Sequence, residues 1–126
     1  MLIFQDVHTC GASSFEDRGS EASPLASDCL KIAENIAGGG TWTINSNGDQ
    51  RQLVEYHTCA FGVESVLPRG RSHFLVGNED IIDAIKGSVS RFERTDGKVG
   101  SRGLMNCQYS IYPDDSTQVM WGLYGN

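Results

Sequence analysis

The chain has 126 residues, of which 39% are hydrophobic and 21% charged, proportions that are ordinary for one globular domain. Its formal net charge of -6 argues against a nucleic-acid partner, because phosphate binding needs a basic surface. No apolar run approaches the roughly 20 residues that cross a bilayer, so we expect no membrane span. A single domain is expected over residues 1–126.

The beginning of the chain differs in character from the rest. Residues 1–22 carry small and charged side chains without periodicity, and they are expected to form an N-terminal arm held at Cys10. Residues 23–124 are expected to form an α+β core. The first residues lack the features of a signal peptide, so the protein is expected to be either cytosolic or a mature secreted chain.

A first helix is expected between residues 23 and 37. Ser23 offers an N-cap oxygen, Pro24 fits the first helical position, and three glycines at 38–40 supply a stop. Four apolar residues recur on one helical face between these signals: Leu25, Cys29, Ile32 and Ile36. Cys29 is therefore expected to point inward, where it could reach a strand beneath the helix.

Strands are expected in the middle of the chain. Residues 41–44 and 52–56 are expected to form a hairpin that turns at Asn47 and Gly48. Residues 59–63 alternate apolar side chains on one face, which is expected to lie under the first helix. Residues 73–77 are expected to form a short strand.

A second helix and a final hairpin complete the prediction. Asn78 is the expected cap of the helix, and Gly97 its expected end. Residues 107–111 and 119–123 are expected to pair as the last hairpin. The predicted fold class is α+β: a two-layer sandwich with two helices on one face of a mostly antiparallel sheet of about five strands.

Four isolated cysteines, Cys10, Cys29, Cys59 and Cys107, lack the close spacing of paired zinc ligands, so we expect no metal. They suit two long-range disulfides in an oxidising compartment, and the alternative is four reduced cysteines in a cytosolic core. His57 and Cys59 could act as a base and a nucleophile, unless a disulfide occupies the cysteine. The sequence shows no cofactor motif, and no enzymatic activity is expected.

Several other side chains could carry a function. Trp42 and Trp121 could form binding platforms, although each alternates with aliphatic residues in the manner of core side chains. Arg69 and Arg71 lie in an expected loop, where a solvated surface is the simpler interpretation. The histidines at positions 8 and 73 lack ligand-spaced companions, and the acidic pairs at 79–80 and 114–115 suit a helix start and a turn.

Three segments carry a resemblance to a known family: "SPLASDCLKIAENIAGGGTWTI", "YHTCAFGV" and "GNEDIIDAIKGSVSRF". Over about residues 8–112 the chain resembles the fungal secreted effector family of necrosis-inducing factors, the homologues of an extracellular effector of the tomato leaf mould fungus. The resemblance implies a secreted, non-enzymatic protein that binds a host or microbial surface protein or glycan. It also implies two disulfides, an inner Cys29 with Cys59 and an outer Cys10 with Cys107.

Two further functions remain as alternatives. The chain is similar in architecture to the smut-fungus viral killer toxins, which implies a channel inhibitor in which Lys98, with Arg69 and Arg71, forms the basic site. The other alternative is a carbohydrate-binding module that uses Trp42 or Trp121. The protein is expected to be a monomer or a noncovalent homodimer, because the even number of cysteines favours bridges within the chain.

Overall fold

The computed structural model describes residues 8–66, 73–111 and 114–126. These residues form an α+β structure with two helices, as the sequence predicts, and with two sheets rather than one. The elements in chain order are β1 (Glu16–Asp17), α1 (Ala26–Asn35), β2 (Thr41–Asn45), β3 (Arg51–Tyr56), β4 (Cys59–Ser65), β5 (His73–Gly77), α2 (Asn78–Phe92), β6 (Ser101–Gln108) and β7 (Ser116–Gly125).

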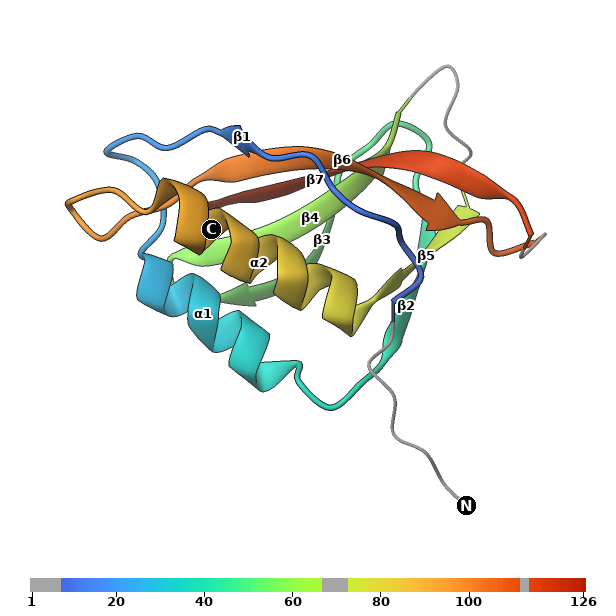
Figure 1. Ribbon diagram of the computed structural model, residues 1–126, viewed down its shortest axis with the longest axis horizontal. Helices are drawn as coiled ribbons and strands as arrows, with labels where there is room; N and C mark the ends of the chain where they lie inside the picture. Colours follow the sequence, from blue (N-terminus) through green and yellow to red (C-terminus); the bar gives the residue numbers. More distant parts are fainter. Residues whose placement is uncertain (1–7, 67–72, 112–113) are drawn as a thin grey trace.

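The larger sheet is antiparallel throughout. It has five strands in the order β1-β6-β7-β4-β3, and a separate antiparallel pair is formed by β2 and β5. Helix α1 contacts α2 and also strands β3 and β4, and in Figure 1 both helices lie below the larger sheet. A last hairpin is present as β6 and β7, which pair along eight positions from Ser101↔Leu123 to Gln108↔Ser116. The expected pairing of residues 107–111 with 119–123 is wrong, because residues 119–123 pair with 101–105 and residues 109–111 follow the end of β6.

The core lies between the helices and the central strands. Successive side chains of a strand point to opposite faces of a sheet, so every second residue of β4 and β7 reaches the core. The inward residues are at most 1% exposed: Cys59, Phe61, Val63, Val119, Trp121 and Leu123. The rings of Phe61 and Trp121 are stacked with centroids 5.8 Å apart. The alternation predicted for residues 59–63 and 119–123 is confirmed.

The predicted hairpin over residues 41–56 is wrong. Strand β2 pairs with β5, and β3 instead pairs with β4 across a tight turn at His57, whose φ is 47°. Two buried serines explain the course of the chain after β2. The Ser65 hydroxyl donates to the carbonyl of Ser46 at 2.8 Å and accepts the Gly48 N–H at 3.0 Å. These bonds hold the 46–48 segment against the end of β4, so that β2 cannot fold back on β3.

Helix α1 begins later than predicted. Leu25 occupies the N-cap position, and its N–H donates to the Thr58 hydroxyl at 2.9 Å. The Ser23 hydroxyl accepts the N–H of Ser20 instead of capping the helix. The Ala26 N–H donates to the Gly97 carbonyl at 2.8 Å. Distant groups therefore satisfy the free N–H groups of the first turn, where the sequence offered a local cap.

Helix α2 also differs from the prediction at both ends. Gly77 is its N-cap residue and Phe92 its last residue, whereas Asn78 was the expected cap and Gly97 the expected end. The side chain of Asp80 accepts the Gly77 N–H at 2.9 Å, which stabilises the first turn. Gly97 lies in the following turn with a φ of 79°, a left-handed conformation that glycine adopts easily.

Strand β6 starts six residues before the predicted strand. The sequence pattern missed these residues because Gly103 stands at an inward position, where an apolar side chain was expected. A Cβ atom at Gly103 would lie 2.1 Å from the carbonyl oxygen of Ser14 and 2.7 Å from the Trp121 ring. The N-terminal arm crosses β6 here, and it adds the short strand β1 that the sequence did not predict. A glycine therefore lets the arm lie close against the sheet.

Candidate functional site

Two disulfides join segments far apart in the chain. Cys29 of α1 is bonded to Cys59 of β4, with Cα atoms 5.3 Å apart, and Cys10 of the arm is bonded to Cys107 of β6. These are the two pairs that the family resemblance implies. Cys59 therefore carries no thiol that could act as a nucleophile, and His57 lies in the exposed turn before it. The catalytic alternative for His57 and Cys59 is wrong.

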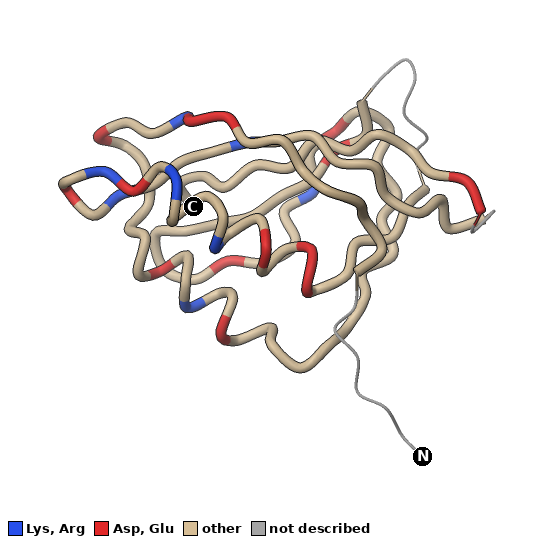
Figure 2. Tube along the Cα trace, viewed as in Figure 1, with Lys and Arg blue, Asp and Glu red and all other residues tan. Residues whose placement is uncertain are grey.

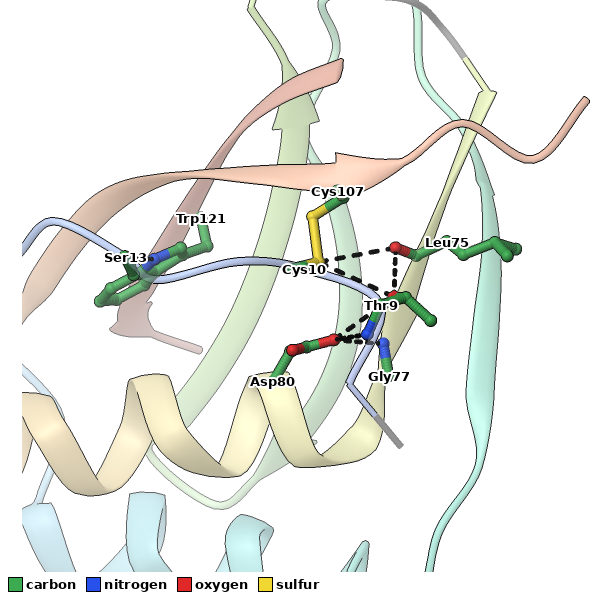
Figure 3. The surroundings of a disulfide bond; sticks show 8 residues. All are labelled: Thr9, Cys10, Ser13, Leu75, Gly77, Asp80, Cys107 and Trp121. Carbon is green, nitrogen blue, oxygen red and sulfur yellow. Dashed lines mark hydrogen bonds between the residues drawn. A yellow bond between two sulfur atoms is a disulfide. The ribbon is translucent and has the colours of Figure 1, made fainter. Parts of the chain in front are cut away.

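The N-terminal arm is fastened to α2 beside the outer disulfide (Figure 3). The Thr9 N–H and the Gly77 N–H both donate to one carboxylate oxygen of Asp80, at 2.8 and 2.9 Å. The Thr9 hydroxyl donates to the carbonyl of Leu75 at 2.7 Å. Asp80 is only 5% exposed, so its carboxylate depends on these donors. Asp80 is thus a structural group that joins the arm to the start of α2.

The two tryptophans occupy different surroundings. The indole N–H of Trp121 donates to the Ser13 hydroxyl at 2.7 Å, and the side chain lies in the core. Trp121 therefore does not provide the exposed platform considered above. Trp42 is half-buried, and its indole N–H donates to Asn78 Oδ1 at 2.8 Å. A binding role for Trp42 stays a prediction.

Of the three candidate basic residues, the structure describes only Lys98. Arg69 and Arg71 lie outside the described residues. The Lys98 ammonium donates to the carbonyl of Glu21 at 2.6 Å, and the neighbouring Arg94 pairs with Asp96 at 3.2 Å. Figure 2 shows basic residues beside acidic ones in the loop between α2 and β6. Lys98 therefore helps to hold the arm, and its role in channel inhibition stays a prediction.

The other polar candidates of the sequence include His8 and the acidic pair Asp114 and Asp115. His8 lies on the surface, and its hydrogen bond to Asp83 raises the pKa of its imidazole. Among the residues that the structure describes, His, Cys, Asp and Glu form no group of three or more that could hold a metal ion. Asp114 and Asp115 are exposed just before β7.

A groove of about 420 Å³ lies on the outward side of the larger sheet. In one outward cross-strand row, Gly122 of β7 lines the groove, and its partner Gly62 of β4 is buried beneath the side chains of Tyr124 and Gln50. On the neighbouring strands the same row contains Arg102 of β6 and Gln52 of β3. The row therefore has no side chain on its two central strands, and it carries a long polar side chain on each flanking strand.

The side chain of Tyr124 lies over this pair of glycines. A Cβ atom at Gly62 would lie 2.8 Å from the Tyr124 hydroxyl, and one at Gly122 would lie 3.4 Å from Cδ1 of its ring. The hydroxyl donates to Gln52 Oε1 at 3.2 Å. Burial raises the pKa of Tyr124, and Glu55 adds to this effect, so that the phenol is a neutral donor at physiological pH. One face of the ring lies against the sheet, and the side chain remains partly exposed in the groove.

Polar side chains surround the tyrosine. The side chain of Gln50 approaches both glycines of the pair, and Arg18 and Ser20 of the arm also line the groove. Arg102 forms an ion pair with Glu16, whose pKa this hydrogen bond lowers. Glu64 contributes a carboxylate to the lining. The charges around the groove are therefore of both signs.

Sequence reasoning did not find this groove. The only local sign was a glycine at the centre of each of two strongly alternating strands, Gly62 in β4 and Gly122 in β7. Glycine inside a strand often marks a close approach of another group. The sequence does not show, however, that the two glycines lie opposite each other.

Comparison with known proteins places the chain in a family. Residues 9–107 match the Hce2 family model, described as "Pathogen effector; putative necrosis-inducing factor". The chain belongs to this effector family. The resemblance noted in the sequence is therefore confirmed. The description of the family is that of an effector and names no enzymatic activity.

Two related proteins of Penicillium expansum contain a region similar to this chain. "Probable chitinase LysM18" is 38% identical over 121 residues, which cover 95% of this chain. "Secreted chitinase LysM12" is 29% identical over 117 residues, which cover 92% of this chain. The chain spans only 8% of the length of either relative. The family domain thus occurs in much longer fungal proteins.

Proposed function

We propose that the protein is a secreted effector that acts by binding a cell-surface carbohydrate of the chitin type, without catalysing a reaction. The observation that carries this proposal is the outward groove, in which a tyrosine ring lies among amide, hydroxyl, guanidinium and carboxylate groups. A ligand site of this kind combines an apolar contact with a few converging polar groups that fix the orientation of the ligand.

The relatives support the choice of ligand. Both are named chitinases, and in both the matched region is a small part of a long chain. A small domain that binds the polymer would hold such an enzyme at its substrate. In this chain the same property would place an effector on a chitin-containing surface.

The disulfides support secretion. Both bonds join distant parts of the chain, and such bonds persist mainly in oxidising compartments. One relative carries the word "secreted" in its name. All four cysteines are used within the chain, so any self-association is proposed to be noncovalent.

Depletion of the protein by insoluble polysaccharides tests the proposal. The purified chain with intact disulfides is mixed with chitin, cellulose or β-1,3-glucan, and the protein left in solution is measured. We expect saturable depletion by chitin that soluble N-acetylglucosamine hexamer reverses. No depletion by any polysaccharide would overturn carbohydrate binding. If the chain instead inhibits calcium flux and Lys98→Glu abolishes that inhibition, the killer-toxin alternative is favoured.

A further inference from the structure

The shape of the groove depends on two paired glycines, Gly62 and Gly122. Neighbouring strands lie about 4.8 Å apart, so the paired Gly62 and Gly122 leave a space about two strands wide, which the side chains of Tyr124 and Gln50 occupy. Its row is flanked by Arg102 and Gln52, whose side chains extend from the strands on either side. The space open to a ligand is the groove beside Tyr124, which Gly122 and Arg102 also line.

The glycines also set the position of the tyrosine ring. At Gly62 an added Cβ atom would meet the Tyr124 hydroxyl at 2.8 Å, the Arg51 carbonyl at 3.0 Å and Gln50 Cγ at 3.2 Å. A larger residue there would lift both side chains from the sheet. The glycine pair therefore allows the ring of Tyr124 to lie against the strands, with its other face toward the groove.

We infer that Tyr124 is the stacking platform for one pyranose ring of a neutral polysaccharide, and that Gln50, Arg102 and Glu64 bind the polar substituents of the neighbouring rings. The inference rests on the proposed function and assigns it to a site. The electron-rich face of an aromatic ring attracts the C–H groups of a sugar ring. Amide, guanidinium and carboxylate groups donate to and accept from hydroxyl and N-acetyl groups.

The charges of the lining favour an uncharged ligand over an anion or a cation. Arg102 is already paired with Glu16, and Arg18 lies 3.9 Å from the same carboxylate. Glu64 adds a further negative charge. A phosphate or an acidic polymer would meet these carboxylates, and a basic peptide would meet the two arginines. A hydroxyl-rich neutral chain meets neither cost.

Titration with a soluble ligand, followed by NMR, tests the assignment to this face. Soluble N-acetylglucosamine hexamer is added to the ¹⁵N-labelled chain, and the backbone amide signals are recorded. We expect saturable shifts at Gly62, Gly122 and Arg102 and none at Gly87, which lies in α2. Saturable shifts confined to other residues would overturn the site while leaving carbohydrate binding intact.

Variants test the role of the tyrosine itself. Tyr124→Ala is expected to weaken binding about tenfold, whereas Tyr124→Phe, which keeps the ring, stays within about threefold of the wild type. Trp42→Ala tests the other candidate platform, and a larger loss of binding than that of Tyr124→Ala would overturn the assignment to Tyr124. Circular dichroism and thermal melting verify that each variant is folded.

Two outcomes separate failure of the site from failure of the function. If Tyr124→Ala is folded and binds like the wild type, the platform is overturned although the protein still binds carbohydrate. If the wild type itself binds neither insoluble chitin nor the soluble hexamer, the proposed function and the site fail together.

Discussion

Gly103 shows how one missing side chain determines the path of a whole segment. Ser14 of the arm and Trp121 of β7 both approach this glycine, at distances that exclude a Cβ atom. The contact involves the carbonyl of Ser14, whose arm is hydrogen-bonded to Leu104, and the buried Trp121 ring, so an added side chain would displace the arm or disturb the core. The close packing of the arm on β6 therefore depends on glycine at this position.

The first prediction follows from this contact. Gly103→Ala is expected to destabilise the protein by about 3 kcal/mol or more and to lower Tm by on the order of 10 °C, because the added methyl overpacks the site. Gly11→Ala is the matched control, since its Cβ atom would meet only the Asn106 carbonyl at 3.9 Å. Equal melting temperatures for the two variants would contradict the close approach.

Asp28 supplies a prediction about pH. Its carboxylate accepts the Thr58 hydroxyl at 2.6 Å and the Thr58 N–H at 3.2 Å, and these bonds lower the pKa of Asp28. A lowered pKa stabilises the folded state above the ordinary value of about 4, and the contribution is lost as the pH falls through the folded pKa.

Asp28→Asn is therefore expected to lower Tm at pH 7 and to approach the wild type as the pH falls below about 4. Glu34→Gln, which removes an exposed carboxylate of α1, is the control. Melting curves between pH 2 and pH 7 measure both effects. A constant difference between Asp28→Asn and the wild type over this range would contradict the proposed contribution.

At the scale of elements, each disulfide holds a different layer in place. The Cys29–Cys59 bond ties α1 to β4 and closes a loop of 30 residues. The Cys10–Cys107 bond ties the arm to β6 across 97 residues. Backbone hydrogen bonds from Gly11, Ser14 and Arg18 then continue along β6. The arm therefore covers an edge that would otherwise expose unpaired backbone groups.

Removal of the inner disulfide is expected to cost about 4 kcal/mol, from the entropy that the bond removes from the unfolded chain. Cys29→Ala, Cys59→Ala and the double variant are expected to lose similar stability, because each removes the same bond. Melting and protease sensitivity measure the loss. Wild-type melting temperatures in all three variants would show that the bond contributes nothing.

Removal of the outer disulfide is expected to affect only the arm and its surroundings. The Cys10→Ala/Cys107→Ala variant is expected to show faster hydrogen exchange at the arm amides of Thr9 and Gly11, whose N–H groups are bonded to Asp80 and Asn106. The amides of α1 serve as the control and are expected to change much less. Uniform acceleration throughout the chain would contradict a local fastening role.

Asn78 connects three elements at the start of α2. Its side-chain amide donates to the Ile36 and Gly39 carbonyls, at 3.2 and 2.9 Å, and its Oδ1 accepts from Trp42. Asn78→Asp would turn a carboxylate oxygen toward two carbonyl groups. We expect a loss of about 2 kcal/mol in unfolding free energy. Denaturant melts measure this loss, and exposed Asn35→Asp is the control.

At the scale of the whole molecule, the covalent framework gives a direct test of the compartment. Two intrachain disulfides and no free cysteine are present, so complete reduction is expected to add four hydrogens to the intact mass. Mass spectrometry of protein from an oxidising host, with and without reductant, measures the change. An unchanged mass would overturn both the bonds and the secretion proposal.

In the described part of the chain, neither helix has the length and apolar character needed to cross a membrane.

Local patterns predicted much of the fold because they reflect local geometry. The alternation of apolar residues in β4 and around Trp121 in β7 identified the buried faces of these strands, since successive side chains of a strand point to opposite faces. The same reasoning failed for β2, because an Asn47-Gly48 turn suits a hairpin even where Ser46 and Ser65 bind the chain elsewhere. It also failed for β1 and for the first half of β6, where Gly103 conceals the alternation.

The sequence by itself determined the α+β class, the inward position of Cys29 and the membership of an effector family. These features depend on side-chain spacing or on runs of consecutive residues. Only the tertiary structure decided which strands pair, which distant groups cap α1 and which outward residues form the groove. Gly62, Gly122 and Arg102 are brought into one row by cross-strand register, and register depends on contacts between segments that lie far apart in the chain.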